Sequence, residues 1–181
     1  MKYLLIGCLA FASAGCSVSA KQPALHDFGL VMSTATHQGK ASINVNAPTW
    51  LWDNRIRYRL LYSSPSQVRF YGLDRWIASP PELFEQLLNF RAKAQDYALI
   101  IRLQDFEQQF DAPDRARVVL RFSAEVYAAD NKQKPNTQEF YLQQSAKTPD
   151  AAGAISGFTD LARQAAERIQ VWLMPLSDHK D

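Results

Sequence analysis

The sequence predicts an α+β fold, a single domain with a mixed, mostly antiparallel sheet and two helices packed on one face. Runs of strand length with alternating apolar and polar residues recur along the chain, as in strands with one covered face. Two segments carry apolar residues at helical spacing, as expected of helices that cover one face of a sheet. With 181 residues, 47% of them hydrophobic, the chain is long enough for one sizeable core.

The first 15 residues have the layout of a secretory signal. Lys2 precedes an apolar run at residues 3–12, and small residues follow up to Gly15. About ten apolar residues are too few to span a bilayer, which takes about 20. The alternative, a buried core helix, would place Met1 and Lys2 in the interior. We therefore expect residues 1–15 to be a signal peptide that is removed after Gly15.

Residues 13–16, Ser-Ala-Gly-Cys, resemble the bacterial lipobox, with Ser13 where an aliphatic residue is usual. The resemblance implies that Cys16 is acylated and becomes the first residue of the mature chain. Several acyl chains would hold the protein on its membrane durably, because each buried methylene contributes roughly 0.8 kcal/mol. Ser17 follows the cysteine where Asp would favour retention, so by resemblance to Gram-negative sorting rules we expect outer-membrane delivery.

The two cysteines agree with an anchored chain. Cys8 leaves with the signal and Cys16 becomes the anchor, so no free thiol or disulfide remains. A metal or redox pair of Cys8 and Cys16 is disfavoured, because no His or carboxylate lies near them. We predict a lipidated N-terminus and tether at residues 16–26 and a folded domain at residues 27–181. Such a tether reaches roughly 15–20 Å.

The first half of the chain contains four predicted strands. Opening strands are expected at residues 26–32 and 41–46. Residues 55–62 then alternate and form a hairpin with the strand that starts at Val68, around a polar turn at residues 63–66. The apolar face of the first hairpin strand consists of Ile56, Tyr58, Leu60 and Tyr62.

The first predicted helix has a strongly specified start. Ser79 is the N-cap, Pro80 takes the first helical position, and Glu82 completes a capping box. An apolar stripe follows, made of Leu83, Phe84, Leu87 and Leu88.

Three further strands are predicted at residues 97–103, 115–127 and 138–144, and the middle one alternates most clearly. The connection between the first two is expected to be a solvated acidic hairpin that carries Asp105, Glu107, Asp111 and Asp114.

The second helix is predicted to start at residues 148–150. Gly153 and Gly157 are expected to weaken it by roughly 1 kcal/mol each relative to Ala. Its apolar seam consists of Ala151, Ile155, Phe158, Ala162, Ala165, Ile169 and Trp172.

No motif in the sequence supplies catalytic chemistry. The histidines His26, His37 and His179 lack metal-ligand spacing, and no glycine-rich phosphate loop is present. We expect no enzyme activity, catalytic residue, metal or cofactor. A net charge of +2, or +1 without Lys2, argues against a nucleic-acid partner.

Four arginines are the most prominent polar feature. Arg55, Arg57 and Arg59 share one strand face, and Arg69 lies across the predicted hairpin. Such crowding is destabilising unless it is compensated. We expect either contact with an acidic partner or anionic lipid headgroups, or an exposed face that neighbouring acids balance.

Residues 55–88 resemble the centre of the ABC-type transport auxiliary lipoprotein family, the PqiC-like lipoproteins that accompany Mce-type lipid transport systems. The resemblance depends on residues 57–60 (RYRL), 68–71 (VRFY) and 74–76 (DRW), followed by Pro80-Pro81 and Leu87-Leu88. The opening at residues 26–30 departs from the aromatic-rich strand of relatives. We expect Arg75, Trp76, Ser79 and Pro80 to form a structural joint rather than a ligand contact.

The resemblance implies a non-enzymatic auxiliary subunit that faces the periplasm and docks a periplasmic Mce-domain protein, with its ABC permease and ATPase, at the outer membrane. An envelope-assembly lipoprotein without a role in lipid flux stays open, as does a small hydrolase of envelope material. Assembly into a homo-oligomer is also left open.

Overall fold

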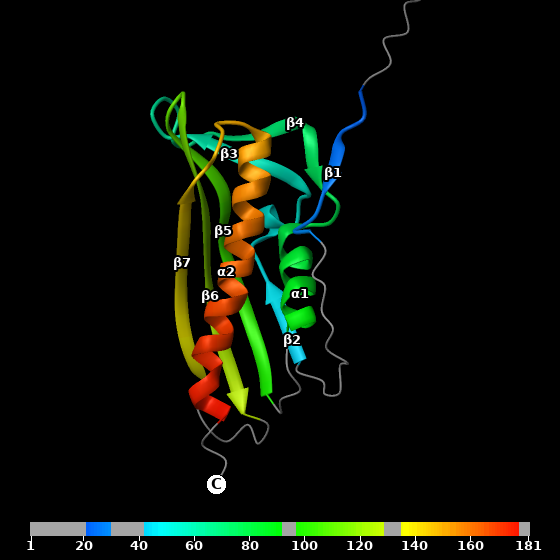
Figure 1. Cartoon of the computed structure of the whole chain (residues 1–181), viewed down its shortest axis with the longest axis vertical. Coiled ribbons are helices and arrows are strands. Elements are labelled where there is room, and N and C mark those ends of the chain that lie inside the picture. The colour runs from blue at the N-terminus through cyan, green and yellow to red at the C-terminus, as the bar shows by residue number, and fades with distance from the viewer. Residues whose placement is uncertain (1–20, 30–41, 92–96, 129–134, 178–181) are drawn as a thin grey trace, which may run out of the picture.

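The computed structural model describes residues 21–29, 42–91, 97–128 and 135–177. They form one sheet of seven strands with two helices on one face, which confirms the predicted α+β fold class (Figure 1). The strands are β1 (Ala24–His26), β2 (Ser42–Asn46), β3 (Arg55–Leu60), β4 (Val68–Trp76), β5 (Tyr97–Ala112), β6 (Arg115–Ala128) and β7 (Asn136–Ser145). The helices are α1 (Pro80–Arg91) and α2 (Ala151–Ser177), and a 3-10 turn, η1, spans Thr49–Leu51.

The sheet is mixed, in the order β1-β4-β3-β5-β6-β7, with β2 also pairing to β5. The two longest ladders, β5 to β6 and β6 to β7, are antiparallel, as is β3 to β4. The parallel pairs are β1 with β4, β2 with β5 and β3 with β5. One edge of β5 thus pairs with two strands, with β2 along residues 98–102 and with β3 along residues 108–110.

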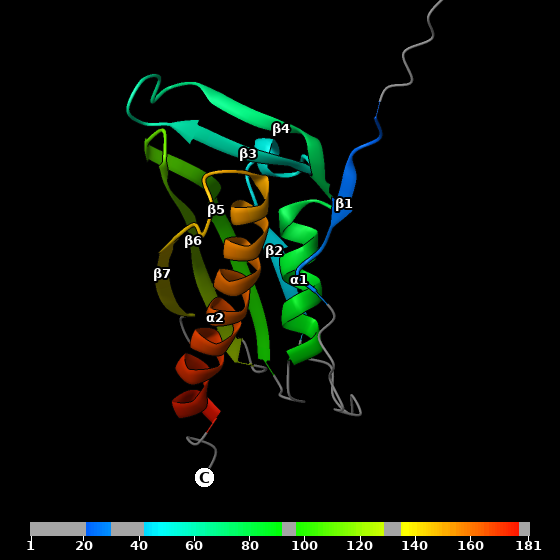
Figure 2. The same ribbon diagram turned by 45° about the horizontal axis from the view of Figure 1, so that its top comes forward.

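The molecule consists of two regions, a body and an arm that lies across one end of it (Figure 2). The body, which we define as β2, β5, β6, β7, α1 and α2, contains the long strands and both helices. The arm, which we define as β1, η1, β3 and β4 with their turns and Ile77, crosses one end of the long strands. The arm bends within β4 (Figure 2). The β3–β4 register shifts between Phe70 and Arg75, an interval that includes Gly72.

The helices cover the sheet because their apolar stripes face its apolar side. The ring of Phe158 on α2 stacks on that of Phe106 on β5 at 4.0 Å. Gly157 lets α2 approach β6, since a Cβ there would lie 2.6 Å from a methyl group of Val118. Gly157 therefore permits close packing, a role that its helix propensity alone does not suggest.

The start of α2 also depends on a glycine. Asp150 accepts a hydrogen bond from the backbone N–H of Gly153 at 2.9 Å and caps the helix. A Cβ on Gly153 would lie only 2.0 Å from the carbonyl oxygen of Thr148. Glycine at this position permits the tight turn before the helix.

The predicted acidic hairpin is wrong. Asp105, Glu107 and Asp111 lie within β5, and only Asp114 is in the turn before β6. The cause is a bulge between Leu103 and Asp105, after which the helix-facing residues change from odd to even positions. Sequence alternation breaks at that point, so the strand looked shorter than it is.

The opening strand also differs from its prediction. β1 takes up Ala24–His26, inside the segment expected to be tether, and pairs in parallel with the last residues of β4. Residues 30–32 of the predicted strand lie outside the described residues.

Candidate functional surfaces

The predicted anchor, Gly15, Cys16 and Ser17, lies outside the described residues. β1 begins eight positions after Cys16. Within the described ranges no helix is long and apolar enough to cross a membrane.

Trp76 is the packing centre of the joint between the arm and the body. It is 1% exposed, and its ring lies 5.4 Å from that of Phe28, 5.9 Å from Phe106 and 6.0 Å from Phe158. Its backbone N–H donates to the carbonyl of Asn54 at 2.8 Å. This surrounding of aromatic rings indicates a structural role for Trp76.

Arg75 precedes Trp76 and pairs by register with Leu25 of β1 and Arg55 of β3. Among the described residues, its Nε is buried without a hydrogen-bond partner. The preceding residue, Asp74, pairs with the Nε2 of His26 at 2.9 Å and so ties β4 to β1.

The capping box at the start of α1 is present. The backbone N–H of Ser79 donates to Oε2 of Glu82 at 2.8 Å, and the Ser79 hydroxyl donates to the same oxygen at 2.6 Å. These bonds, led by that of the hydroxyl, lower the pKa of Glu82 because they favour its charged form. Pro80 is the first helical residue.

The four predicted arginines do not share one area. Arg57 is paired with Phe70 and Arg59 with Val68, whereas Arg69 is paired with Tyr58 on the opposite face of the hairpin. Arg69 donates to the side chain of Gln67 at 2.9 Å. The expected crowding of four like charges is therefore wrong.

The three remaining arginines have different environments. Arg55 donates to Asp53 at 2.6 Å, and that bond lowers the pKa of the carboxyl. Arg59 holds buried Glu107 in a bidentate pair, with two N–O distances of 3.0 Å, and this bond raises the pKa of Arg59. Arg57 instead donates to the backbone carbonyl of Trp50 at 3.0 Å, and burial lowers its pKa.

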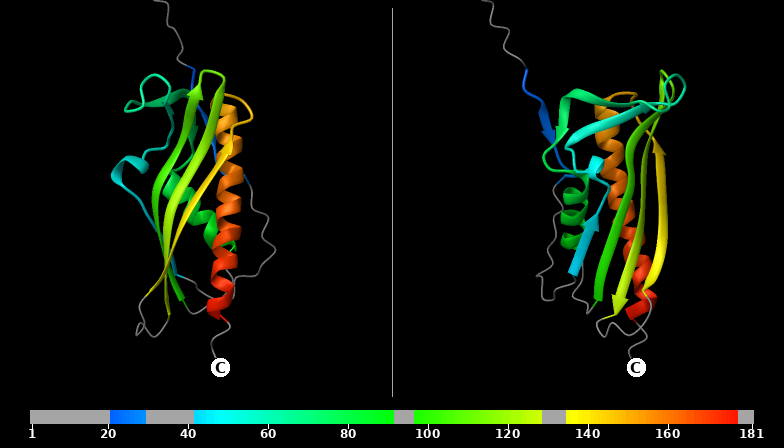
Figure 3. Two further views of the ribbon diagram at one scale, coloured as in Figure 1. Left: turned by 90° about the vertical axis from the view of Figure 1, so that its left-hand side faces the viewer. Right: turned by 180° about the vertical axis from the view of Figure 1, so that it is seen from behind.

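Aromatic side chains accompany Arg55 and Arg57. The guanidinium carbon of Arg55 lies 3.7 Å from the centre of the Phe70 ring, and that of Arg57 lies 5.8 Å from it. Trp50, 61% exposed, and Trp52, also exposed, belong to or border η1. We call Trp50, Trp52, Arg55, Arg57 and Phe70 the aromatic–arginine surface. Figure 3 (left) shows the cyan segment with η1 on the sheet side away from α2.

The sequence prediction missed the two tryptophans of this surface. The signal was available in residues 49–52, Thr-Trp-Leu-Trp, where only Leu51 is buried. Two large aromatics one residue apart around a buried leucine indicate an exposed aromatic pair.

Each carboxylate of β5 forms an ion pair with an arginine. Asp105 pairs with Arg121 at 2.7 Å, Glu107 with Arg59, and Asp111 with Arg117. Among the residues that the structure describes, no group of three or more His, Cys, Asp and Glu side chains is arranged to hold a metal ion.

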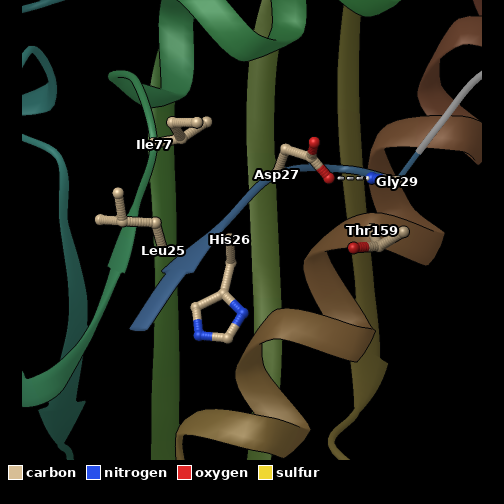
Figure 4. A pocket seen from close by; sticks show the side chains of 6 residues that line it. All are labelled: Leu25, His26, Asp27, Gly29, Ile77 and Thr159. Atoms are coloured by element: carbon tan, nitrogen blue, oxygen red, sulfur yellow. Dashed lines mark hydrogen bonds between the residues drawn. The ribbon is translucent and has the colours of Figure 1, made fainter. Parts of the chain in front are cut away.

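A depression of about 340 Å³ lies beside β1 (Figure 4). Its polar groups already have partners: Asp27 accepts from the backbone N–H of Gly29 at 2.7 Å, and His26 pairs with Asp74. Leu25 and Ile77 supply its apolar part. A second depression, of about 630 Å³, lies between β7 and α2.

No family model matches the chain, and no curated protein matches it. Among solved structures, a Xanthomonas campestris protein of the family DUF330 is 14% identical, with a TM-score of 0.67 over 83% of this chain and 94% of that one. An uncharacterised protein is 12% identical, with a TM-score of 0.63 over 82% and 97% of the two chains. A candidate lipoprotein from Caulobacter crescentus is 15% identical, with a TM-score of 0.44 over 56% and 85%. The first two likenesses show a shared fold.

Proposed function

We propose that this protein is a non-enzymatic outer-membrane lipoprotein, anchored through Cys16 and facing the periplasm. Its role is to dock the Mce-domain component of an ABC-type lipid transport system at that membrane. The observation that carries the proposal is one continuous order in the chain: a lipobox-like Cys16, a short connection to β1, and the motif-bearing residues 55–88 that form β3, β4 and α1.

The aromatic–arginine surface supports the docking role. Tryptophan and arginine are enriched at the energetic centres of protein interfaces. Trp50 is 61% exposed and presents its ring to solvent, while Arg57 is held by the carbonyl of the same residue. A partner that covers Trp50 would bury a large apolar ring whose neighbouring guanidinium is already oriented.

The buried polar groups support a non-enzymatic role. Glu107 is engaged by Arg59, and the side chain of Gln108 joins the hydroxyl of Tyr71 at 2.5 Å to the carbonyl of Asp150 at 3.3 Å. Each of these bonds links two strands or a strand and the start of α2, so these groups serve the connections between elements.

Co-purification from the envelope tests the docking role. The acylated chain should retain an Mce-domain protein, and Trp50→Ala combined with Arg57→Ala should lower the recovered partner at least tenfold. Tyr141→Ala is the matched control, because Tyr141 is an exposed aromatic residue on β7 and does not belong to the aromatic–arginine surface. Recovery of envelope-assembly proteins without any Mce-domain partner would contradict the proposal and favour an assembly role.

A further inference from the structure

Three apolar side chains lie together and exposed at the edge of the arm. Leu25 of β1 is 60% exposed, Leu73 of β4 is 51% exposed, and Ile77, directly after β4, is 60% exposed. Leu25 is paired with Arg75, and Leu73 and Ile77 stand two positions before and after Arg75. Because side chains alternate along a strand, the three share one face. We call them the apolar edge.

β1, which contributes Leu25 to the apolar edge, is the first strand after the predicted anchor. Ala24, the first residue of β1, lies eight residue steps after Cys16. Their fully extended length is about 26–29 Å, and their average reach as a flexible tether is about 14–17 Å. Acylation at Cys16 would therefore hold β1 within a short distance of the lipid headgroups.

The charges around the apolar edge suit an interfacial position. Lys21 is exposed and precedes β1, and Arg75 stands between the apolar side chains. Long basic side chains extend to phosphate headgroups while their stems stay among apolar groups. Two carboxylates lie nearby, and both have partners. Asp74 is bonded to His26 at 2.9 Å, and Asp27, which lines the same depression as Leu25 and Ile77, accepts from the backbone N–H of Gly29 at 2.7 Å.

We infer that the apolar edge enters the headgroup region of the bilayer in which Cys16 is anchored, so that the lipid surface is the occupant of this face. The inference rests on the proposed anchoring. It fixes the orientation of the protein, because β1 and the C-terminal end of α2 lie toward opposite ends of the molecule (Figure 1). The lower end of α2, with Val171, then points away from the membrane.

A fluorescent probe at single cysteines tests this orientation. The mature chain retains only the acylated Cys16, so Ile77→Cys introduces one site for an environment-sensitive dye. Val171→Cys is the matched control, because Val171 is also an exposed β-branched residue, at 64%. The acylated, labelled full chain is reconstituted into vesicles of phosphatidylethanolamine and phosphatidylglycerol that contain a lipid-borne quencher.

We expect the probe at position 77 to shift to shorter wavelength and to be quenched at least twofold more than the probe at position 171. Leu25→Asp combined with Leu73→Asp should abolish that difference while the chain still floats with the vesicles. Equal, water-like emission from both probes on floating chains overturns the inference and leaves the anchoring intact. Quenching of both probes alike also overturns it. A chain that does not float with the vesicles overturns the anchoring, and the inference with it.

Discussion

The arm and the body differ in where they place their large apolar side chains. In the body, α2 and the long strands enclose theirs, including Phe122, Leu120 and Phe158, which are fully buried. The arm exposes Leu25, Trp50, Trp52, Tyr62, Leu73 and Ile77, which are six of the nine large apolar residues that are exposed in the described ranges. Exposed apolar groups that gather in one region mark contact surfaces.

Within one sheet, the body thus holds most of the buried core, and the arm holds most of the exposed large apolar side chains of the described ranges. The arm is joined to the body through Trp76 and through the short parallel pairing of β3 with β5. Its outer surfaces are therefore free to contact other molecules without loss of core packing. Substitutions in the two regions should accordingly affect different measurements.

Trp76→Ala should have the largest effect on stability. It removes a ring that is 1% exposed and that touches Phe28, Phe106 and Phe158, so we expect a loss of about 3–5 kcal/mol in the free energy of unfolding. Urea unfolding followed by circular dichroism measures it. Trp50→Ala, the arm's exposed counterpart, should change stability by no more than about 0.5 kcal/mol. Equal losses for both tryptophans would contradict the division between arm and body.

A pair of glycines gives the next largest contrast. Gly157→Ala places a Cβ 2.6 Å from a methyl group of buried Val118. Overpacking costs about 1–3 kcal/mol, and the higher helix propensity of alanine offsets about 1 kcal/mol of that cost, so we expect a net loss of up to about 2 kcal/mol. At Gly72, in the bend of β4, a Cβ would meet no atom within 4 Å. Gly72→Ala should stay within about 0.5 kcal/mol of the parent in the same unfolding assay, and a stabilised Gly157→Ala variant would disprove the close approach of α2.

The smallest effect is expected at the cap of α1 and depends on pH. The pKa of Glu82 is lowered in the folded protein, chiefly by the Ser79 hydroxyl, so its contribution to stability is present above the ordinary value of 4.5. That contribution is lost as the pH falls through the folded pKa, because the unfolded chain binds the proton more readily.

Glu82→Gln should therefore cost up to about 1 kcal/mol at neutral pH, and the difference from the parent should vanish in acid. Unfolding curves collected between pH 7 and pH 3 measure this trend. Asp114→Asn, in the exposed turn between β5 and β6, is the control and should change little. A difference at Glu82 that stays constant over this range would exclude the capping role.

Local signals in the sequence were sufficient for part of the fold. The start of α1 was predictable because Ser79, Pro80 and Glu82 are adjacent in sequence and in space. The β3–β4 hairpin was predictable for the same reason, since a short turn joins its strands. Its arginine placement was not, because the register between the strands decides which face each residue occupies.

Features that depend on distant partners were not predictable. β1 is only three residues long and is defined by its pairing with β4, some 50 positions later. The bulge after Leu103 inverts the facing of β5 without a glycine or proline to mark it. The need for glycine at position 157 follows from the contact of α2 with Val118 of β6, which the sequence of the helix does not reveal. In each case the missing information was a contact between elements rather than a property of the segment.

In the proposed function, an acylated Cys16 begins the mature chain and holds the arm at a membrane. Mass spectrometry of the intact protein, extracted from the outer membrane without hydrolysis of esters, tests this most directly. We predict a chain that begins at Cys16 and carries a diacylglyceryl group and an amide-linked acyl chain. A mature protein that begins at another residue, or one that carries a bare Cys16 thiol, would contradict the proposed anchoring.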